Sequence, residues 1–426
     1  MTRRSSEKSG AYRKTILKNG LRIVTEQIPG LRSVALGVWV DVGSRNERGP
    51  ENGLCHFIEH MLFKGTRKRD ARELAAALES LGGSLNGFTS REQTCFHARF
   101  LDEHLPTAVD VIADLMCNST ITAEHVEREK KVVLEEIKEA LDTPSDKIHD
   151  IFSQTFWGKN HPLGQTIMGP PENILALSRP QVLRFMKEHY RTGSVVVAAS
   201  GSIPHERLVG LVKEKFRFGT GVSNSVVGAE FRSDRSVTIE QNKSKQTHLC
   251  LGFATPPYSS PDKMTILALS SFLGGGMSSV LFQKIREDKG LAYSVYSFND
   301  FYRDAGVFGV YLGTDGKNLA KATALILMEL RKMKQKKVTP SQLKTLKSQM
   351  KGHLILSQES PNGRMNRLAR QELMVERFQP IQEMIREIER VSASGICEMA
   401  NLIFNESRIA VSALGPIGKN ALSGVI

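Results

Sequence analysis

The stretch "TITAEHVEREKKVVLEEI", residues 120–137, has a counterpart in the second half of the chain, "KKVTPSQLKTLKSQMKGHLI", residues 336–355. A shift of 217 positions superposes Thr122 on Thr339, because 339 − 122 = 217. Both stretches follow another helix-like segment, "LPTAVDVIADLM" in the first half and "LAKATALILMEL" in the second. Self-similarity at a large separation indicates two copies of one structural unit. The chain is therefore predicted to fold as a duplicated pair of domains.

Strand patterns complete the plan of each half. Alternating apolar runs begin the halves, "SVALGVWVDVG" at 33–43 and "QTHLCLGFATPP" at 246–257, and a helix, further strands and the helix pair follow each run. This order predicts an α+β fold with two duplicated domains, each a mainly antiparallel β-sheet with helices packed on one face. We expect the domains to span residues 1–218 and 235–426, joined by a Gly/Ser-rich linker at 219–234.

Length and composition agree with two globular domains. The 426 residues would form domains of about 200 residues each. A content of 40% hydrophobic and 24% charged residues is ordinary for folded proteins. No apolar run approaches the roughly 20 residues that cross a bilayer, and the basic start of the chain reads as a free tail rather than a signal peptide. We therefore expect no membrane association.

Cysteine usage and charge concern the compartment and the partners. The five cysteines are scattered, odd in number and without a CxxC pair, which predicts reduced thiols and a cytoplasmic protein. The net charge of +13 raises the question of an acidic partner such as nucleic acid. The densest basic run, at 331–337, ends a helix-like segment, and no nucleic-acid-binding motif accompanies it. We expect no nucleic-acid binding.

A second stretch, "GLCHFIEHMLFKGT" at residues 53–66, places polar residues in an otherwise apolar helix that we expect at 52–63. At about 100° per residue, His56, Glu59 and His60 share one face of that helix. Two imidazoles one turn apart can share a tetrahedral metal ion, and a carboxylate between them can polarise water. This H-x-x-E-H order is the inverse of the zinc-binding H-E-x-x-H order. The pattern also arises by chance, so a further ligand is required.

A catalytic zinc site normally has three protein ligands and one open position. The helix predicted between Thr122 and Pro144 supplies candidates for the third ligand. Glu129 and Glu136 lie seven positions, or two turns, apart on the face that carries the apolar stripe, whereas Glu135 points to solvent. Glu136 is therefore the better ligand candidate, and Glu129 is placed to fix an imidazole by a hydrogen bond.

These residues carry a resemblance to a known family. "HFIEHMLFKGT", followed 76 positions after His60 by Glu136 in "LEEI", resembles the zinc peptidase family that contains pitrilysin, insulysin and the mitochondrial processing peptidase. The resemblance continues through "GGSLNGFTSREQT" and "HPLGQTIMG" to "SFLGGGMSSVLFQKIREDKGLAYSV", covers nearly the whole chain, and is closest in plan to short bacterial members. It implies one Zn²⁺ per chain, bound by His56, His60 and Glu136, with Glu59 as the general base that takes a proton from water.

The resemblance also implies substrate contacts. Arg286 and Tyr293 in "REDKGLAY" match an Arg and a Tyr that contact the substrate and stabilise the oxyanion; a surface Arg and a core Tyr are the alternative. Family members add the substrate as a strand beside an edge strand carrying Asn-Ala, where this chain has Asn86 and Gly87. A simple turn is the alternative for that dipeptide. For a short chain the family implies a homodimer, or a heterodimer with a paralogue, in which Arg286 and Tyr293 of one subunit complete the site of the other.

The predicted function is a zinc-dependent endopeptidase that hydrolyses extended peptides or unfolded segments inside a dimeric chamber. The second half is an internal control, because apolar or small residues replace the motif there, and Glu129 and Glu136 correspond to Leu346 and His353. One half therefore lacks the site. The alternative function is a noncatalytic scaffold or the partner subunit of a heteromeric peptidase, and the complete motif in the first half argues against it.

Overall fold

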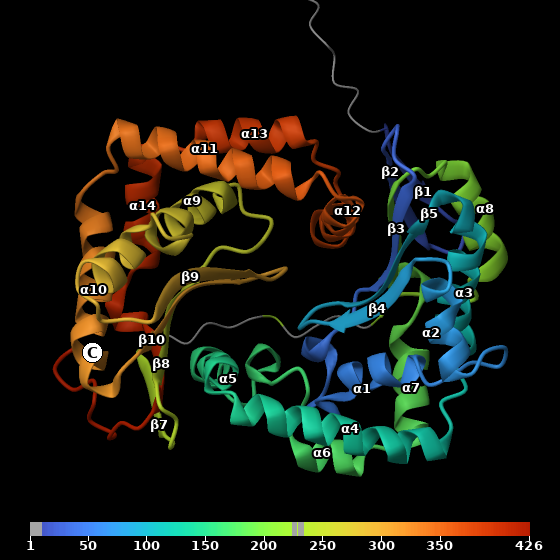
Figure 1. Cartoon of the computed structure of the whole chain (residues 1–426), viewed down its shortest axis with the longest axis horizontal. Helices are drawn as coiled ribbons and strands as arrows, with labels where there is room; N and C mark the ends of the chain where they lie inside the picture. The colour runs from blue at the N-terminus through green and yellow to red at the C-terminus, as the bar shows by residue number, and fades with distance from the viewer. Residues whose placement is uncertain (1–10, 224–227, 229–233) are drawn as a thin grey trace, which may run out of the picture. The chain divides into compact units, whose positions relative to one another are not determined.

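The computed structural model describes residues 11–223, 228 and 234–426, and Figure 1 shows its two β-sheets with their helices. The sequence predicts a free tail at the basic start of the chain, residues 1–14; residues 1–10 lie outside the described part, but residues 11–14 belong to strand β1 (Ala11–Ile16). Much of the predicted linker at 219–234 also lies outside the described part. The chain forms two compact units, and neither is one continuous stretch of sequence. Unit 1 combines Met1–Ile137, Thr166–Val227 and Leu356–Phe378, and unit 2 combines Lys138–Gln165, Gly228–Ile355 and Gln379–Ile426.

Sheet 1 belongs to unit 1 and has six strands in the order β1-β2-β6-β3-β5-β4. Neighbouring strands pair antiparallel except β2 and β6, which are parallel. β4 therefore lies at an edge of the sheet, and no strand within the described residues pairs with its other side. The strands are β1 (Ala11–Ile16), β2 (Arg22–Gln27), β3 (Ser33–Val40), β4 (Ser84–Thr89), β5 (Thr94–Leu101) and β6 (Val195–Gly201).

The core of unit 1 lies between one face of sheet 1 and its helices. Leu36, Val38 and Val40 alternate along β3 toward this face, as the period of two in the sequence predicts. The helices of unit 1 on this side include α1 (Leu54–Leu62), α2 (Ala71–Glu79), α3 (Leu105–Asn118), α4 (Ala123–Asp142), α6 (Pro171–Ala176), α7 (Arg179–His189) and α8 (His205–Lys215). The predicted helices at 52–63 and after Thr122 correspond to α1 and α4.

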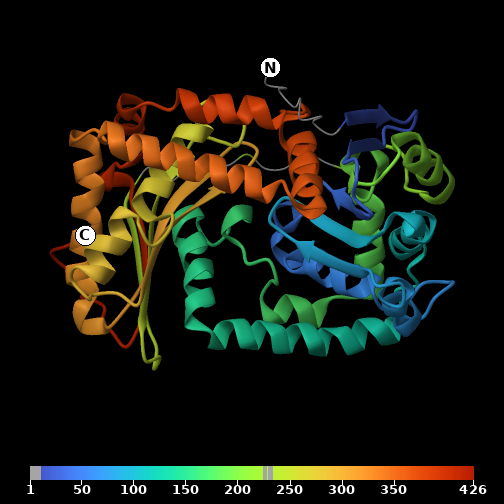
Figure 2. The same cartoon turned by 45° about the horizontal axis from the view of Figure 1, so that its top comes forward.

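The other face of sheet 1 is covered by a helix from far along the sequence. α12 (Pro361–Val375) packs Leu368 and Leu373 against Ala35 and Trp39 of β3. A charged pair fixes this packing: Arg367 Nη2 donates to Glu26 Oε2 of β2 at 2.6 Å, with both side chains buried. Figures 1 and 2 show α12, in orange-red, beside the blue strands of sheet 1.

Sheet 2 belongs to unit 2 and has five strands in the order β7-β11-β8-β10-β9, with only β7 and β11 parallel. The strands are β7 (Ser236–Gln241), β8 (Thr247–Thr255), β9 (Ser294–Phe301), β10 (Gly306–Thr314) and β11 (Ala410–Gly415). The helices that form its main core are α9 (Lys263–Gly274), α10 (Leu319–Gln335), α11 (Pro340–Ser357), α13 (Ile381–Arg390) and α14 (Ala393–Ile403).

A helix from the first half of the chain covers the second face of sheet 2. α5 (Pro144–Trp157) packs Phe152 and Phe156 against Cys250 and Tyr311. α5 follows α4 directly, and α12 follows α11 directly, so each long helix of the duplication leads into a helix that packs on the other half's sheet. This exchange was not part of the sequence prediction.

The predicted fold class is confirmed. Each unit contains a mixed, largely antiparallel sheet with most of its helices on one face. The prediction did not include the exchanged helix, α12 or α5, that covers the second face of each sheet. The limits of the duplicated halves at 218 and 235 stay predictions. Among the described residues, no helix combines the length and the apolar composition that a bilayer crossing requires.

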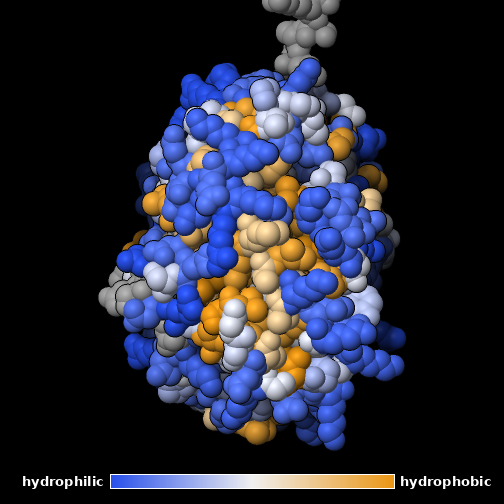
Figure 3. Space-filling view, turned by 90° about the vertical axis from the view of Figure 1, so that its left-hand side faces the viewer, coloured by the Kyte–Doolittle hydropathy of each residue, from blue (hydrophilic) through white to orange (hydrophobic). Residues whose placement is uncertain are grey.

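The side of unit 2 that carries α10 has a mixed surface. Figure 3 shows hydrophobic residues gathered in the middle of this side and hydrophilic residues around them. Exposed apolar side chains on the helices of unit 2 include Met328 of α10 and Leu402 of α14. All five cysteines lie in the described part, and none forms a disulfide.

Candidate metal centre

The polar motif lies on an amphipathic helix. Leu54, Phe57 and Ile58 of α1 are fully buried in the core of unit 1. His56, Glu59 and His60 lie on the opposite, half-buried side of the same nine-residue helix. The apolar side fixes the helix against sheet 1 and thereby directs the three polar groups to one place.

The N-terminus of α1 is held by a residue that the sequence did not indicate. Gly53 precedes the helix with φ 101° and offers no side chain for capping. The buried carboxylate of Glu47 takes this role, accepting hydrogen bonds from Gly53 N at 2.9 Å, Cys55 N at 2.5 Å and Asn52 Nδ2 at 3.0 Å. Burial raises the pKa of Glu47 to about 7, although these hydrogen bonds oppose the rise. Glu47 lies six positions before Gly53, outside the usual capping spacing, so no pattern pointed to it.

Three predicted ligands come together between α1 and α4. One ligand atom each of His56, His60 and Glu136 lies within 4.8 Å of the others. His60 Nε2 is 3.4 Å from Glu136 Oε2, and His56 Nε2 is 3.8 Å from the same oxygen. No other such cluster of His, Cys, Asp or Glu occurs in the described part of the chain.

Glu129 lies behind His60, as the two-turn spacing from Glu136 predicted. Glu129 Oε1 is 2.8 Å from His60 Nδ1, and Lys64 Nζ is 2.7 Å from Glu129 Oε2. Burial alone would raise the pKa of Glu129, but the hydrogen bonds from His60 and Lys64 outweigh it and lower that pKa. A charged carboxylate at Nδ1 favours the tautomer of His60 whose Nε2 lone pair faces Glu136 and His56.

The two histidines differ in their readiness to bind a cation. Burial, together with the charge of His60, lowers the pKa of His56 to about 4, so His56 is neutral at neutral pH. Burial also acts against protonation of His60, but Glu129 and Glu136 outweigh it and raise the pKa of His60. Protons and metal ions therefore compete for His60, and the site should bind metal less tightly in acid.

The donor set fits a zinc ion. Two imidazoles that can be neutral and one carboxylate form the ligand set of a catalytic zinc site, in which the fourth position is open. His56 Nδ1 is buried and has no hydrogen-bond partner in the described residues, whereas His60 Nδ1 is held by Glu129. The site thus orients one imidazole through a carboxylate and the other through packing alone.

Glu59 lies beside the ligand cluster and contacts the edge strand. Thr89 Oγ1 of β4 donates to Glu59 Oε2 at 2.6 Å. Burial raises the pKa of Glu59, and the hydrogen bond from Thr89 opposes the rise. Gly87 is also close: a Cβ atom on it would lie 3.2 Å from Glu59 Cγ. The predicted base and the predicted substrate strand therefore adjoin, and Thr89 is a contact that the sequence analysis missed.

The remaining predicted residues lie in their expected elements. Asn86 and Gly87 are in edge strand β4 rather than in a turn. Arg286 and Tyr293 belong to unit 2, in the π-helical turn Phe282–Glu287 and directly before β9. Tyr293 is 54% exposed, and its hydroxyl is 3.4 Å from Asp315 Oδ1, so it is not a core tyrosine. Their position relative to the ligand cluster stays a prediction.

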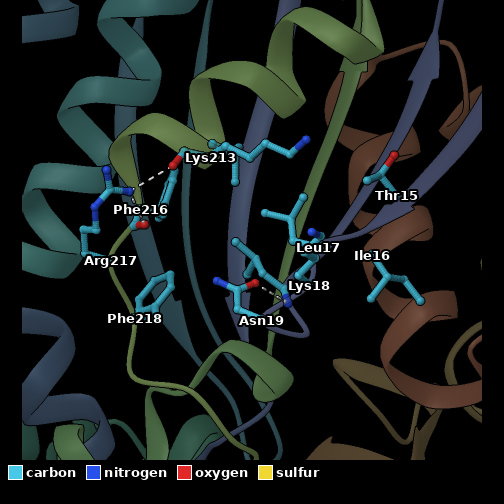
Figure 4. A pocket seen from close by; sticks show the side chains of 11 residues that line it. Thr15, Ile16, Leu17, Lys18, Asn19, Lys213, Phe216, Arg217 and Phe218 are labelled. Atoms are coloured by element: carbon cyan, nitrogen blue, oxygen red, sulfur yellow. Dashed lines mark hydrogen bonds between the residues drawn. The ribbon is translucent and has the colours of Figure 1, made fainter.

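Two hollows elsewhere lack such chemistry. A hollow of about 440 Å³ in unit 2 lies between the end of α9 and α11, and hydroxyl and amide side chains with His353 line it. A hollow of about 500 Å³ in unit 1 lies between the turn after β1 and the end of α8 (Figure 4). No carboxylate, imidazole or thiol lines this second hollow, and its Arg217 donates to the carbonyls of Lys213 and Phe216. The cluster around His56 is the candidate for chemistry.

Comparison with known proteins agrees with the resemblance. Residues 22–171 match the family described as insulinase (peptidase family M16), and residues 176–350 match the peptidase M16 inactive domain. The chain is 38% identical to the uncharacterized zinc protease YmxG of Bacillus subtilis, covering 94% of this chain and 97% of the relative. It is 36% identical to an uncharacterized zinc protease of Mycobacterium leprae, covering 97% and 94%.

Solved structures show the same fold. A protease from Helicobacter pylori superposes with a TM-score of 0.88 at 22% identity, covering 96% of this chain and all of the other. The structure of a peptidase M16 inactive domain from Pseudomonas fluorescens gives the same TM-score at 19% identity, covering 95% of this chain and 98% of the other. At these identities the likeness concerns the fold.

Proposed function

The chain belongs to the insulinase family of peptidases, family M16, and from this premise we propose that it is a zinc-dependent endopeptidase acting on extended peptides or unfolded segments. One observation carries the proposal. His56, His60 and Glu136 present ligand atoms within 4.8 Å of one another, with the carboxylate of Glu59 on the same helix face. The named relatives are zinc proteases, which supports zinc as the metal.

His56, His60 and Glu136 would hold the zinc ion, one ion per chain. Zinc supplies Lewis acidity, which makes water more acidic and polarises a carbonyl group. Glu129 keeps His60 in the tautomer that offers Nε2, and Lys64 keeps Glu129 charged. An imidazole oriented by a carboxylate in this way needs little reorganisation to bind a metal ion.

Glu59 is the proposed general base. Its partly buried carboxylate has a raised pKa, which brings its proton affinity nearer to that needed for transfer at neutral pH. It would take a proton from water and pass that proton to the nitrogen of the leaving amine. The bond from Thr89 holds one oxygen of Glu59, leaving the other to exchange the proton.

The unpaired edge of β4 is the proposed substrate position. An extended peptide can add to an open sheet edge through main-chain hydrogen bonds. β4 is an edge strand, and its residues Gly87 and Thr89 adjoin Glu59. Peptides that are already folded present no such strand, so extended or unfolded segments are the expected substrates.

Quaternary structure and location complete the proposal. We propose a homodimer, or a heterodimer with a paralogue, in which Arg286 and Tyr293 of one subunit contact the substrate at the zinc site of the other. The exposed hydroxyl of Tyr293 is available for such a contact. Five cysteines without a disulfide support a reducing, cytoplasmic environment.

The first prediction concerns Glu59. Glu59→Gln should keep bound zinc but lose peptide cleavage by a factor of about 10²–10⁴, the usual contribution of a general base. Zinc content by metal analysis and cleavage of an unstructured peptide measure the two effects. Glu135→Gln, an exposed change on α4 beside the ligand Glu136, is the matched control and should cleave normally.

Two outcomes contradict the proposal. A Glu59→Gln protein that cleaves at the wild-type rate would exclude Glu59 as the base. A wild-type protein that binds no zinc and cleaves no peptide would favour the noncatalytic scaffold instead.

A further inference from the structure

Four Asn-Gly pairs occur in the chain, at Asn19, Asn52, Asn86 and Asn362. An asparagine followed by glycine can lose its side-chain amide spontaneously, because glycine has no side chain to shield its backbone nitrogen. The reaction requires that this nitrogen reach the side-chain amide carbon of the asparagine. The four pairs share one local sequence chemistry, so the structure decides which of them can react.

In two pairs the glycine nitrogen is held away by a local turn. Gly20 N donates to Leu17 O at 2.8 Å, and Asn19 Oδ1 instead accepts from Leu21 N. Gly363 N donates to Ser360 Oγ at 3.0 Å in the first turn of α12. In both pairs the nitrogen has another acceptor.

The pair at Asn52 is fixed most firmly. Asn52 is buried, and its Nδ2 donates to Glu47 Oε2 at 3.0 Å and to Thr166 O at 2.8 Å. Gly53 N donates to the same Glu47 carboxylate at 2.9 Å. The glycine nitrogen therefore has the carboxylate as its acceptor, and the side-chain amide is held by two acceptors of its own.

Asn86 has the opposite arrangement. Asn86 is exposed on the edge strand β4. Its side-chain oxygen Oδ1 accepts a hydrogen bond from the backbone nitrogen of the next residue, Gly87, at 2.8 Å. The amide carbon that must be attacked is bonded directly to that oxygen. Of the four pairs, this is the one in which the glycine nitrogen contacts the side-chain amide of its own asparagine.

Strand pairing explains why Gly87 N is available. The hairpin after β4 closes with Ser90 N donating to Gln93 O at 2.7 Å. Hydrogen-bonded pairs alternate along an antiparallel ladder, so counting back from Ser90 leaves Gly87 in a pair without ladder bonds. Its N–H therefore points to the open edge of the sheet, where no strand of the described chain competes for it.

We propose that Asn86 is a site of spontaneous deamidation to aspartate and isoaspartate. Gly87 N loses its proton to hydroxide and bonds to Asn86 Cγ. The Cγ–Nδ2 bond then breaks, and the leaving nitrogen takes a proton from water and departs as ammonia, which regenerates hydroxide and leaves a succinimide. One water then opens the ring. Attack at Cγ yields aspartate, and attack at the main-chain carbonyl yields isoaspartate. In sum, the amide and water give the acid and ammonia, without an oxidant or reductant.

Isoaspartate at this position would alter the edge strand. Its main chain runs through the former side-chain carbon, which adds one atom between residues 86 and 87 and displaces the rest of β4 from its register with β5. Thr89, three residues on, holds Glu59 through a 2.6 Å hydrogen bond. The resulting loss of peptide cleavage rests on the proposed function, whereas the deamidation does not.

Mass spectrometry of the aged full-length protein tests the modification. The chain is kept at mildly alkaline pH, and digests taken over time are examined for the mass gain of amide-to-acid conversion at each Asn-Gly pair. Asn86 should convert several-fold faster than Asn19, Asn52 and Asn362, with isoaspartate detected by a methyltransferase specific for it. Equal rates at Asn86 and Asn19, or an unchanged Asn86, would overturn the proposal.

Two variants separate the reaction from general instability. Gly87→Ala places a methyl group on the attacking residue, and Asn86→Gln lengthens the side chain so that a strained larger ring must form. Each should suppress the conversion at position 86 without slowing it at the other three pairs. If position 86 gains acid as fast in both variants as in wild type, the proposed route through Gly87 N is wrong.

The effect on cleavage is measured in the same samples, each relative to its own activity at time zero. Wild-type cleavage should fall in proportion to the isoaspartate at position 86. Methyltransferase repair converts isoaspartate to aspartate, so it should raise cleavage to the level of an unaged Asn86→Asp variant. Full activity at high isoaspartate would refute the link to Glu59. An absence of cleavage at time zero would count against the proposed function while leaving the mass measurement decisive for Asn86.

Discussion

At the scale of single residues, the spacing of the motif identified the groups that meet at the candidate centre. His56, His60 and Glu136 could be predicted because helical periodicity fixes which side chains share a face. Glu47 and Thr89 could not, because their contacts depend on a loop conformation and on strand packing that no periodic pattern encodes. The sequence thus indicated the ligands, and the structure shows what holds them.

Glu129 should matter for metal affinity more than for the fold of α4. Glu129→Gln removes the charge beside His60 Nδ1 and the partner of Lys64. Loss of such an orienting carboxylate typically weakens metal binding by about 10–100-fold. Competition with a chelator measures zinc affinity; Glu127→Gln, an exposed change on the same helix, should leave it unchanged. Equal affinities for wild type and Glu129→Gln would contradict the assignment.

Glu47 should make stability depend on pH. Burial raises its pKa from 4.5 to about 7, so the folded state binds this proton more tightly than the unfolded chain. Its contribution to stability is therefore complete below about pH 4.5 and is lost as the pH rises through about 7. Glu47→Gln removes the titration, so the unfolding free energy of wild type should fall relative to this variant across that window.

Urea unfolding of metal-free protein at several pH values measures the effect of Glu47. Glu79→Gln, at an exposed position on α2, should follow the wild-type pH dependence. Parallel curves for wild type and Glu47→Gln would show that Glu47 does not titrate between the two states.

At the scale of elements, prediction succeeded where the pattern is local. α1, α3, α4, β3 and β8 could be placed because each shows its own period, 3.6 or 2, over its whole length. The packing of α5 and α12 could not be predicted, because an amphipathic helix does not say which sheet it covers. Their partners lie in the other half of the sequence; Thr155 of α5, for example, contacts Thr238 of β7, 83 residues further along the chain.

The packing of α12 has a direct energetic test. Leu368 of α12 is 2% exposed and contacts the second face of sheet 1. Leu368→Ala should lower the unfolding free energy by about 2–5 kcal/mol, the range for a leucine truncated in a core. Asn366→Ala, an exposed change on the same helix, should have little effect. Denaturant unfolding compares the two, and a loss of similar size in both would contradict the packing described.

At the scale of the whole molecule, duplication produced one half with the ligand cluster and one without. The second half has Leu346 and His353 where the first has Glu129 and Glu136, so it can contribute to a site only through other residues. Arg286 and Tyr293 are the proposed contribution. If they act across a dimer, a zinc site in one subunit needs Arg286 and Tyr293 only in the partner subunit and not in its own chain.

Mixing two inactive variants tests this sharing. Chains with Glu59→Gln and chains with Tyr293→Phe should each cleave poorly, and subunit exchange between them should restore up to about one half of the sites in mixed dimers. Peptide cleavage before and after exchange measures the recovery. Mixing Glu59→Gln with itself is the control, and an absence of recovery in mixed dimers confirmed by mass would contradict a shared site.

The exchange of α5 and α12 also bears on how the chain is made. A ribosome completes the six strands of sheet 1 by residue 201, but α12 begins only at Pro361. Until then, the face that carries Ala35, Trp39 and Val196 has no cover from its own helix. This apolar face of the nascent chain therefore stays uncovered while about 160 further residues are synthesised, since 361 − 201 = 160. Because exposed apolar surface favours aggregation, we expect a chaperone to protect this face during translation.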